Sequence, residues 1–195
     1  MKITNSQPSI TKQYSIPNHQ IPKNILCIGT LCPRKNQLRL IEAFKRLKTD
    51  AELVLAGGRG WMDEEIVTQA RETPGVLWLD HVSGERYRKL LGSATILALP
   101  SLYEGFGLPV LDAMYAGVPV LTSDRGSLRE VAGDAALYSD PEDVDSIAQG
   151  LQLLLEDEHL RRECSEKGRL QAQRFHWEQT VDLFLEAITY NRTYV

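Results

Sequence analysis

The 195-residue sequence has few cysteines and histidines and lacks several motifs that would identify its functional class. Its three cysteines, Cys27, Cys32 and Cys164, show no C-x-x-C spacing, and its four histidines are scattered, so neither a disulfide framework nor a zinc site is indicated. The motifs G-x-x-x-x-G-K-[ST] and H-E-x-x-H are absent, which argues against a Walker-type nucleotide site and a zinc protease site. We expect the cysteines to be reduced thiols of a cytoplasmic protein.

Charge and hydropathy argue against two further classes. A net charge of −4 has the wrong sign for a general nucleic-acid-binding protein. No apolar run approaches the length needed to cross a membrane, and the polar, proline-containing residues 1–23 lack the apolar core of a signal peptide. With 43% hydrophobic and 25% charged residues, the composition is that of a globular chain.

Short apolar runs alternate with helical patterns along most of the chain. Because most of the runs are separated by helices, the pattern predicts an α/β fold with a Rossmann-like six-stranded parallel sheet and helices on both faces. Ligands bind such sheets outside the carboxyl ends of the strands. Strands are predicted near residues 24–30, 52–57, 76–79, 95–99, 118–122 and 135–138, and the last helices over about 142–156, 158–174 and 177–190.

The segment LPSLYEGFGLPVLDAM, residues 99–114, combines a strand end, an acidic loop and the start of a helix. Gly105 and Gly107 flank a phenylalanine, and glycines so placed let successive N–H groups turn toward a ligand. Two carboxylates, Glu104 and Asp112, then lie beside the positive end of the helix dipole. This arrangement indicates a site for an anion and a polyol. The alternative is a plain strand-to-helix connection in which Glu104 is solvated.

A second polar loop, LCPRKN at residues 31–36, also leads from a predicted strand to a helical pattern. It carries Arg34 and Lys35. Two cations at a helix N-terminus oppose the helix dipole, so a bound anion explains their placement better than simple exposure does. The alternative is that both are ordinary exposed charges.

Two weaker motifs favour structural interpretations. In LVLAGGRGW, Gly58 and Gly60 begin a G-x-G-x-x-G pattern, but Asp63 occupies the third glycine position, so a dinucleotide-binding dehydrogenase is a poor fit. Asp143 and Asp145 form a D-x-D motif of the kind that binds metal in some transferases. Acidic residues stabilise the first turn of a helix, and we expect these two to begin one.

The run EGFGLPVLD and the residues that follow it, AMYAGVPVLTSDRGSLREVAGDAALYSDPED, resemble the nucleotide-sugar half of retaining GT-B glycosyltransferases, the glycosyl transferases group 1 family. The resemblance implies a hexosyltransferase that uses a nucleoside diphosphate sugar, with no cofactor and no metal. In that family two acidic residues, normally both Glu, are separated by seven residues. Here Glu104 would contact hydroxyls of the transferred sugar, and the shorter Asp112 would contact the ribose.

The same resemblance assigns the remaining site residues. Lys35 and Arg34 would hold the pyrophosphate and act in catalysis with Glu104, and Arg34 would supply a charge that the family usually places where this chain has Thr30. The backbone amides of residues 106–108 would bind sugar hydroxyls or the distal phosphate. The donor-binding residues implied are Gly29, Thr30, Gly57, Gly58, Arg59, Val82, Gly105, Phe106, Gly107, Leu108 and Asp112.

Two of these segments have open alternatives. The resemblance places Gly57, Gly58 and Arg59 beside the phosphate or the pocket floor, whereas a tight turn under a helix explains them equally well. Val82 lies where the family meets the nucleobase mainly through backbone groups. His81, beside it, is expected at the surface.

A complete enzyme of this family resembles two α/β domains with the reaction between them. Residues 1–22 are predicted to be a leader or linker segment and residues 23–195 the nucleotide-sugar-binding domain with its C-terminal helices. We therefore expect the chain to need an N-terminal acceptor-binding domain or a separate subunit, and a lipid-linked acceptor or peripheral membrane contact is compatible with it. The alternative is a non-catalytic nucleotide-sugar-binding or interaction module.

Overall fold

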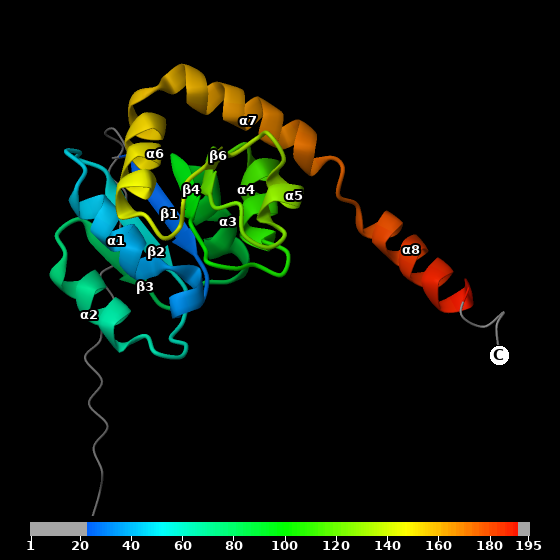
Figure 1. The fold of residues 1–195 in the computed structure, drawn as a ribbon, viewed down its shortest axis with the longest axis horizontal. Helices are drawn as coiled ribbons and strands as arrows, with labels where there is room; N and C mark the ends of the chain where they lie inside the picture. Colours follow the sequence, from blue (N-terminus) through cyan, green and yellow to red (C-terminus); the bar gives the residue numbers. More distant parts are fainter. Residues whose placement is uncertain (1–22, 191–195) are drawn as a thin grey trace, which may run out of the picture.

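The computed structural model describes residues 23–190, so the predicted leader segment, residues 1–22, lies outside the described part. The described chain forms a sheet of six parallel strands in the order β3-β2-β1-β4-β5-β6 (Figure 1). The α/β fold and the parallel sheet are confirmed, and every strand lies within its predicted range. The strands are β1 (Asn24–Ile28), β2 (Glu52–Ala56), β3 (Val76–Leu79), β4 (Ile96–Leu99), β5 (Val120–Thr122) and β6 (Leu137–Tyr138).

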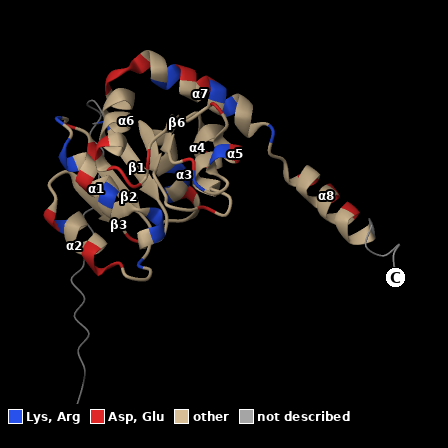
Figure 2. Cartoon of the chain, in the orientation of Figure 1, with Lys and Arg blue, Asp and Glu red and all other residues tan. Residues whose placement is uncertain are grey.

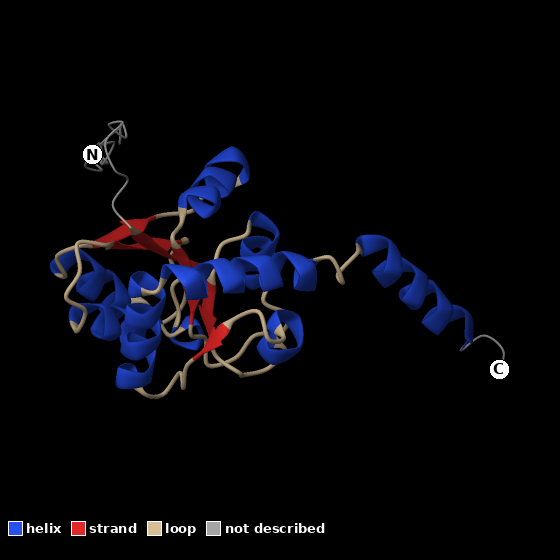
Figure 3. Ribbon diagram, turned by 90° about the horizontal axis from the view of Figure 1, so that it is seen from above, coloured by secondary structure: helices blue, strands red, loops and turns tan. Residues whose placement is uncertain are grey.

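Helices lie on both sides of this sheet (Figure 3). Helix α1 packs against α2 and α6, while α4 packs against α3, α5 and α7. The last three helices begin within two residues of their predicted starts. The helical elements are the 3-10 turn η1 (Pro33–Lys35), α1 (Gln37–Lys45), α2 (Glu64–Glu72), α3 (Gly84–Ser93), α4 (Leu108–Ala116), α5 (Leu128–Ala132), α6 (Val144–Glu156), α7 (Glu158–Ala172) and α8 (Trp177–Tyr190).

The inner strands form the core because they are nearly continuous apolar runs, as strands covered on both faces require. Ile25, Leu53, Leu97 and Leu99 are fully buried. Charged side chains gather on the helices and loops around the sheet (Figure 2). Because these strands are buried and apolar, polar groups meet at their carboxyl ends and in the loops that follow them.

The loops after β1 and β2 are pressed together at that carboxyl edge. Leu31 donates its N–H to the carbonyl of Gly58 at 3.0 Å, and the amide of Gly29 donates to Ala56 at 3.0 Å. A Cβ added to Gly57 would lie 2.0 Å from the carbonyl oxygen of Gly29. A glycine is therefore required at position 57 by the close approach of two backbones.

Helix α8 has a different environment from the rest of the chain. It extends from the end of α7 away from the sheet (Figures 1 and 3). Its apolar side chains, among them Trp177, Phe184 and Ile188, are exposed. Within residues 23–190, none of the helices has the length and apolar character that crossing a membrane would require.

We predict that Gly57→Ala destabilises the fold, because the new methyl group would collide with the Gly29 carbonyl. Overpacking of this kind costs about 2 kcal/mol, which lowers the melting temperature of a chain this size by roughly 4–8 °C. Gly92→Ala is the matched control, since Gly92 lies in α3 with no atom within 4 Å of an added Cβ. Helices favour Ala over Gly, so calorimetry should show an unchanged or higher melting temperature for the control. Equal losses in both variants would contradict the packing argument.

Candidate active site

Lys35, Arg34 and Glu104 meet at the carboxyl edge of the sheet. Lys35 Nζ donates to Glu104 Oε1 at 2.6 Å, and Arg34 Nη1 donates to Glu104 Oε2 at 2.9 Å. The two cations follow β1 and the carboxylate follows β4, and these strands are neighbours in the sheet. The structure thus brings together the two segments that the sequence indicated separately.

The cations are held by a short turn and not by an open loop. Residues 33–35 form η1, and Asn36 follows it in the left-handed region with φ of 61°, a conformation that asparagine tolerates. The Asn36 side-chain amide donates to the carbonyls of Pro100 at 2.9 Å and Pro141 at 2.6 Å. These bonds attach the turn to the end of β4 and to the loop before α6, which fixes the position of Lys35.

Glu104 is buried, with only 7% of its side chain exposed. Burial alone would raise the pKa of this carboxyl, but hydrogen bonds from Lys35 and Ser101 and the nearby positive charges outweigh it and lower the pKa below its usual value. Ser101 Oγ donates to Oε1 at 2.7 Å. Glu104 is therefore a carboxylate at neutral pH. The alternative of a solvated Glu104 is wrong.

The backbone of Glu104 is also held in place. Its carbonyl oxygen accepts from both the N–H and the hydroxyl of Ser127, each at 3.2 Å. Gly126 passes so close that an added Cβ would lie 2.3 Å from the same oxygen. The loop after β5 therefore holds the backbone of the acidic loop in place.

The charge balance of this cluster modifies the argument made from the sequence. Glu104 neutralises one of the two cations. Part of the reason for their placement is therefore this pairing with Glu104 and not a bound anion. Lys35 is 8% exposed, so it is not an ordinary surface charge, whereas 40% of the Arg34 side chain is exposed. Two cations and one carboxylate leave one net positive charge, and Arg34 carries it to the surface. An anion is therefore still favoured at this edge.

The loop after Glu104 presents backbone donors. Gly107, with φ of 95°, precedes α4, and a proline stands in the first turn of that helix as expected. Among residues 23–190, the amides of Phe106, Gly107 and Leu108 donate to no acceptor. Free N–H groups at the start of a helix suit a phosphate or hydroxyl oxygen.

Asp112 has a partner that sequence reasoning missed. Tyr87 Oη, from α3, donates to Asp112 Oδ2 at 2.5 Å. Burial and then the bond to Asp112 raise the pKa of Tyr87, so the phenol stays protonated and acts as the donor. Ser101 and Asn36 were missed in the same way, because contacts between residues distant in sequence leave no local pattern.

The glycine cluster after β2 forms a tight turn. Arg59 donates through two nitrogens to Asp63, at 2.9 and 2.7 Å, and the amide of Gly60 donates to the same carboxylate at 3.0 Å. The hydrogen bond from Arg59 lowers the pKa of Asp63. This turn still lies next to the cation cluster, because Gly57 packs on Gly29 and a Cβ on Gly29 would lie 2.9 Å from Lys35 Cε. A role of these glycines in donor binding stays a prediction.

Other expected positions lie at the periphery. His81 is exposed, as expected, and Val82 packs partly buried against the core. Thr30 is exposed, and its carbonyl accepts from the Gln37 side chain at 3.1 Å. Asp143 caps α6 by accepting from the amide of Asp145 at 2.9 Å, which confirms the helix-start interpretation of the D-x-D motif.

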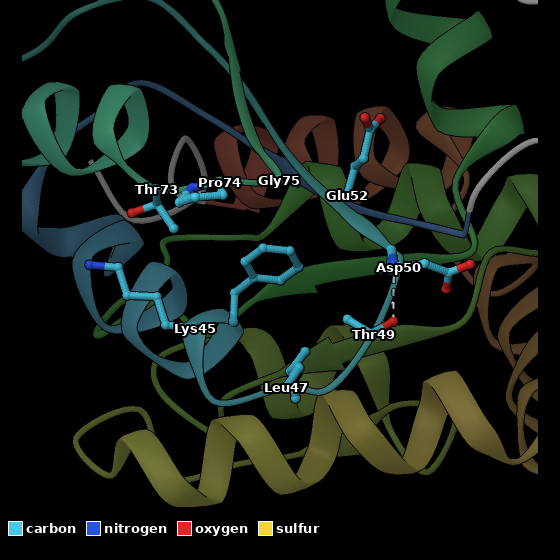
Figure 4. A pocket seen from close by; sticks show the side chains of 10 residues that line it. Lys45, Leu47, Thr49, Asp50, Glu52, Thr73, Pro74 and Gly75 are labelled. Atoms are coloured by element: carbon cyan, nitrogen blue, oxygen red, sulfur yellow. Dashed lines mark hydrogen bonds between the residues drawn. The ribbon is translucent and has the colours of Figure 1, made fainter.

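A separate pocket of about 530 Å³ lies at the opposite edge of the sheet, beside the amino ends of β2 and β3 (Figure 4). The residues that line it include Phe44, Lys45, Asp50, Glu52 and Thr73. None of the predicted site residues lines this pocket. The carboxyl edge, with its buried ion cluster and free amides, is therefore the candidate active site.

The family model described as Glycosyl transferases group 1 matches residues 11–171. The O-antigen chain mannosyltransferase B of Escherichia coli is 39% identical over 170 residues, which cover 82% of this chain and 45% of the relative. The MMP alpha-(1->4)-mannosyltransferase of Mycolicibacterium hassiacum is 30% identical over 191 residues, 91% of this chain and 46% of the relative. The chain spans about half the length of these relatives.

Solved structures show the same fold. Sucrose-phosphate synthase from Thermosynechococcus elongatus superimposes with a TM-score of 0.74 at 25% identity, over 87% of this chain and 46% of that chain. HepE from Anabaena, solved in complex with UDP-glucose, gives a TM-score of 0.78 at 19% identity, over 87% of this chain and 49% of that chain.

We predict that Glu104→Gln destabilises the chain in a pH-dependent way. Because the pKa of Glu104 is lowered in the fold, its ionised form contributes stability above the usual glutamate pKa of about 4.3, and this contribution is lost as the pH falls through the lowered value. Urea unfolding at pH 7 should show a loss of about 2–3 kcal/mol, because Lys35 is left buried without its partner. The loss should begin to shrink near the usual glutamate pKa and should approach zero only below the lowered pKa, where the parent carboxyl is also neutral.

Glu85→Gln serves as the control for this experiment. Glu85 forms an exposed pair with Lys89 on α3, and exposed pairs contribute little. The control should therefore match the parent at each pH. A loss in Glu104→Gln that stays equally large from pH 7 down to the acid end of the range, below the lowered pKa, would show that charge is not its cause.

Proposed function

The chain belongs to the glycosyl transferases group 1 family, and on that premise we propose that it is the nucleotide-sugar-binding domain of a retaining hexosyltransferase. The observation that carries the proposal is the convergence of Lys35, Arg34 and Glu104 beside the free amides of residues 106–108. Cations and amides suit a diphosphate, and a carboxylate suits sugar hydroxyls. Both kinds of group occur here on one edge of the sheet.

We propose a mannosyl group as the transferred sugar. The support is that several relatives are mannosyltransferases, among them O-antigen chain mannosyltransferase B and the serotype-specific mannosyltransferase WbdA, both of Escherichia coli. The proposed donor is a nucleoside diphosphate sugar. Asp112, held by Tyr87, would take the ribose, and the segment around Val82 would meet the base.

The proposed chemistry on this chain is electrostatic. When the bond between the anomeric carbon and the diphosphate oxygen breaks, negative charge grows on the departing diphosphate. The bond to the acceptor oxygen forms on the same face of the sugar, and the proton of the acceptor hydroxyl passes to the departing diphosphate. Lys35 and Arg34 would stabilise that charge more in the transition state than in the bound donor, which is what accelerates a reaction. Glu104 would hold the sugar hydroxyls so that the anomeric carbon is correctly oriented.

The acceptor site is proposed to lie outside this chain. The chain spans about 45% of the length of its Escherichia coli relative. We propose that an N-terminal acceptor-binding domain or a separate subunit completes the enzyme, and that the chain alone binds the donor without transferring the sugar. The cytoplasmic location expected from the sequence stays a prediction.

We predict distinct binding defects for two variants, measured by calorimetry with GDP, UDP and ADP and with GDP-mannose, UDP-glucose and ADP-glucose. Lys35→Ala should weaken binding of the preferred bare nucleoside diphosphate by about 10- to 100-fold, since it removes a charged contact to phosphate. Glu104→Ala should lose the extra affinity for the sugar-bearing form over the bare nucleotide, because the contact to the sugar hydroxyls is gone.

Lys45→Ala is the control, because Lys45 lines the pocket at the opposite edge of the sheet. It should bind like the parent. Equal binding by all variants would remove the site assignment. Sugar transfer by the isolated chain at an ordinary enzymatic rate would refute the need for a partner, and tight binding with no partner-dependent turnover would favour a nucleotide-sugar sensor.

A further inference from the structure

The hydroxyl of Ser101 has no role in the mechanism described above, yet it contacts the carboxylate at its centre. Ser101 Oγ donates to Glu104 Oε1 at 2.7 Å. Ser101 is completely buried, at 0% exposure. Ser101 lies two residues after the end of β4 and three residues before Glu104.

The two oxygens of Glu104 have different surroundings. Oε1 accepts from Lys35 and from Ser101, and both of these donors are buried. Among residues 23–190, Oε2 accepts from Arg34 alone, and that side chain is 40% exposed. Oε1 is therefore bound by two buried donors, whereas Oε2 pairs with the partly exposed Arg34 and keeps capacity to accept another hydrogen bond.

The backbone that carries Ser101 is fixed. The carbonyl of the preceding residue, Pro100, accepts from Asn36 at 2.9 Å, and the carbonyl of Glu104 is held by Ser127. With the main chain anchored on both sides, the direction of the Glu104 side chain depends on what binds its carboxylate. Lys35 is a point charge that can bind either oxygen, but the Ser101 hydroxyl reaches Oε1 from a set direction.

We propose that Ser101 is a positioning residue for Glu104: its hydroxyl holds Oε1 against Lys35 and so presents Oε2 to a hydroxyl of the donor sugar. The inference rests on the proposed function, in which Glu104 contacts that sugar. Removal of the hydroxyl leaves Glu104 charged and paired with its two cations but takes away the neutral donor that helps to fix the rotation of its carboxylate. The preference for the sugar-bearing donor then falls, while the diphosphate contacts remain.

Calorimetric titration of the 195-residue chain tests this with the same nucleotides and nucleotide sugars as above. Ser101→Ala should lose about tenfold of the preference for the sugar-bearing donor over its bare nucleotide, the value of one hydrogen bond to a charged group. Affinity for the bare nucleotide should stay close to that of the parent. Ser101→Thr keeps a hydroxyl and should restore the preference.

Ser123→Ala is the matched control. Ser123 is an equally buried serine whose hydroxyl donates to the backbone carbonyl of Ser101 at 2.5 Å, without contacting Glu104. Its removal leaves the Ser101 hydroxyl in place. The control should keep the preference for the sugar-bearing form even where its melting temperature falls.

A second measurement needs no ligand. Ser101 favours the ionised form of Glu104, so Ser101→Ala should move the acid limb of the stability curve to higher pH, whereas Ser123→Ala should lower stability by the same amount at pH 4 and pH 7. The charged groups that face Glu104 are Lys35 and Arg34 from η1. The Cys27 thiol on β1 stays neutral, because burial, with a smaller effect from Glu104, raises its pKa to about 12.

The possible outcomes distinguish failure of the Ser101 role from failure of the proposed function. If the parent prefers a sugar-bearing donor and Ser101→Ala keeps that preference and the parent's acid limb, the role of Ser101 is overturned and the proposed function stands. If the parent binds none of the nucleotides or nucleotide sugars, the proposed function fails and the role of Ser101 fails with it. Loss of the preference in Ser101→Ala, with rescue by Ser101→Thr, supports the proposal.

Discussion

The buried contact between Lys35 and Glu104 is the interaction on which the rest of the site depends. Moving two charges out of water is expensive, and their attraction offsets that cost only when geometry is good and further hydrogen bonds are made. Here Ser101 and Arg34 supply those bonds. The cluster therefore determines where the carboxylate and the cations lie more than it adds to stability. It also keeps a net positive charge at the edge where the free amides lie.

The order of the strands explains why this cluster forms. The chain builds β1, β2 and β3 in one direction across the sheet, then returns to place β4 on the other side of β1. Open parallel sheets bind ligands at the point where the strand order reverses, because the loops there diverge and leave a crevice. Lys35 follows β1 and Glu104 follows β4, so the two residues stand on the two sides of that reversal.

Much of this arrangement could be predicted from the sequence, because it depends on local patterns. Apolar runs locate buried strands, and strand ends locate the loops of Lys35 and Glu104. Ser101, Asn36 and Tyr87 could not be identified in this way, since each acts through a side-chain contact that only the fold creates. Asn36 and Pro141 are 105 residues apart. The burial of Glu104 was missed for the same reason, since a glutamate before glycine is typical of a solvated loop.

Two departures from the family pattern can now be understood together. Thr30 stands where the resemblance leads us to expect an arginine, and Arg34, the residue expected to supply that charge, lies 2.9 Å from the Glu104 carboxylate. Asp112 is one methylene shorter than glutamate, and the hydroxyl of Tyr87 lies 2.5 Å from its carboxylate. Each departure therefore coincides with a neighbouring polar group that accommodates it, so charge and hydrogen-bonding capacity at the edge are kept although the residues differ.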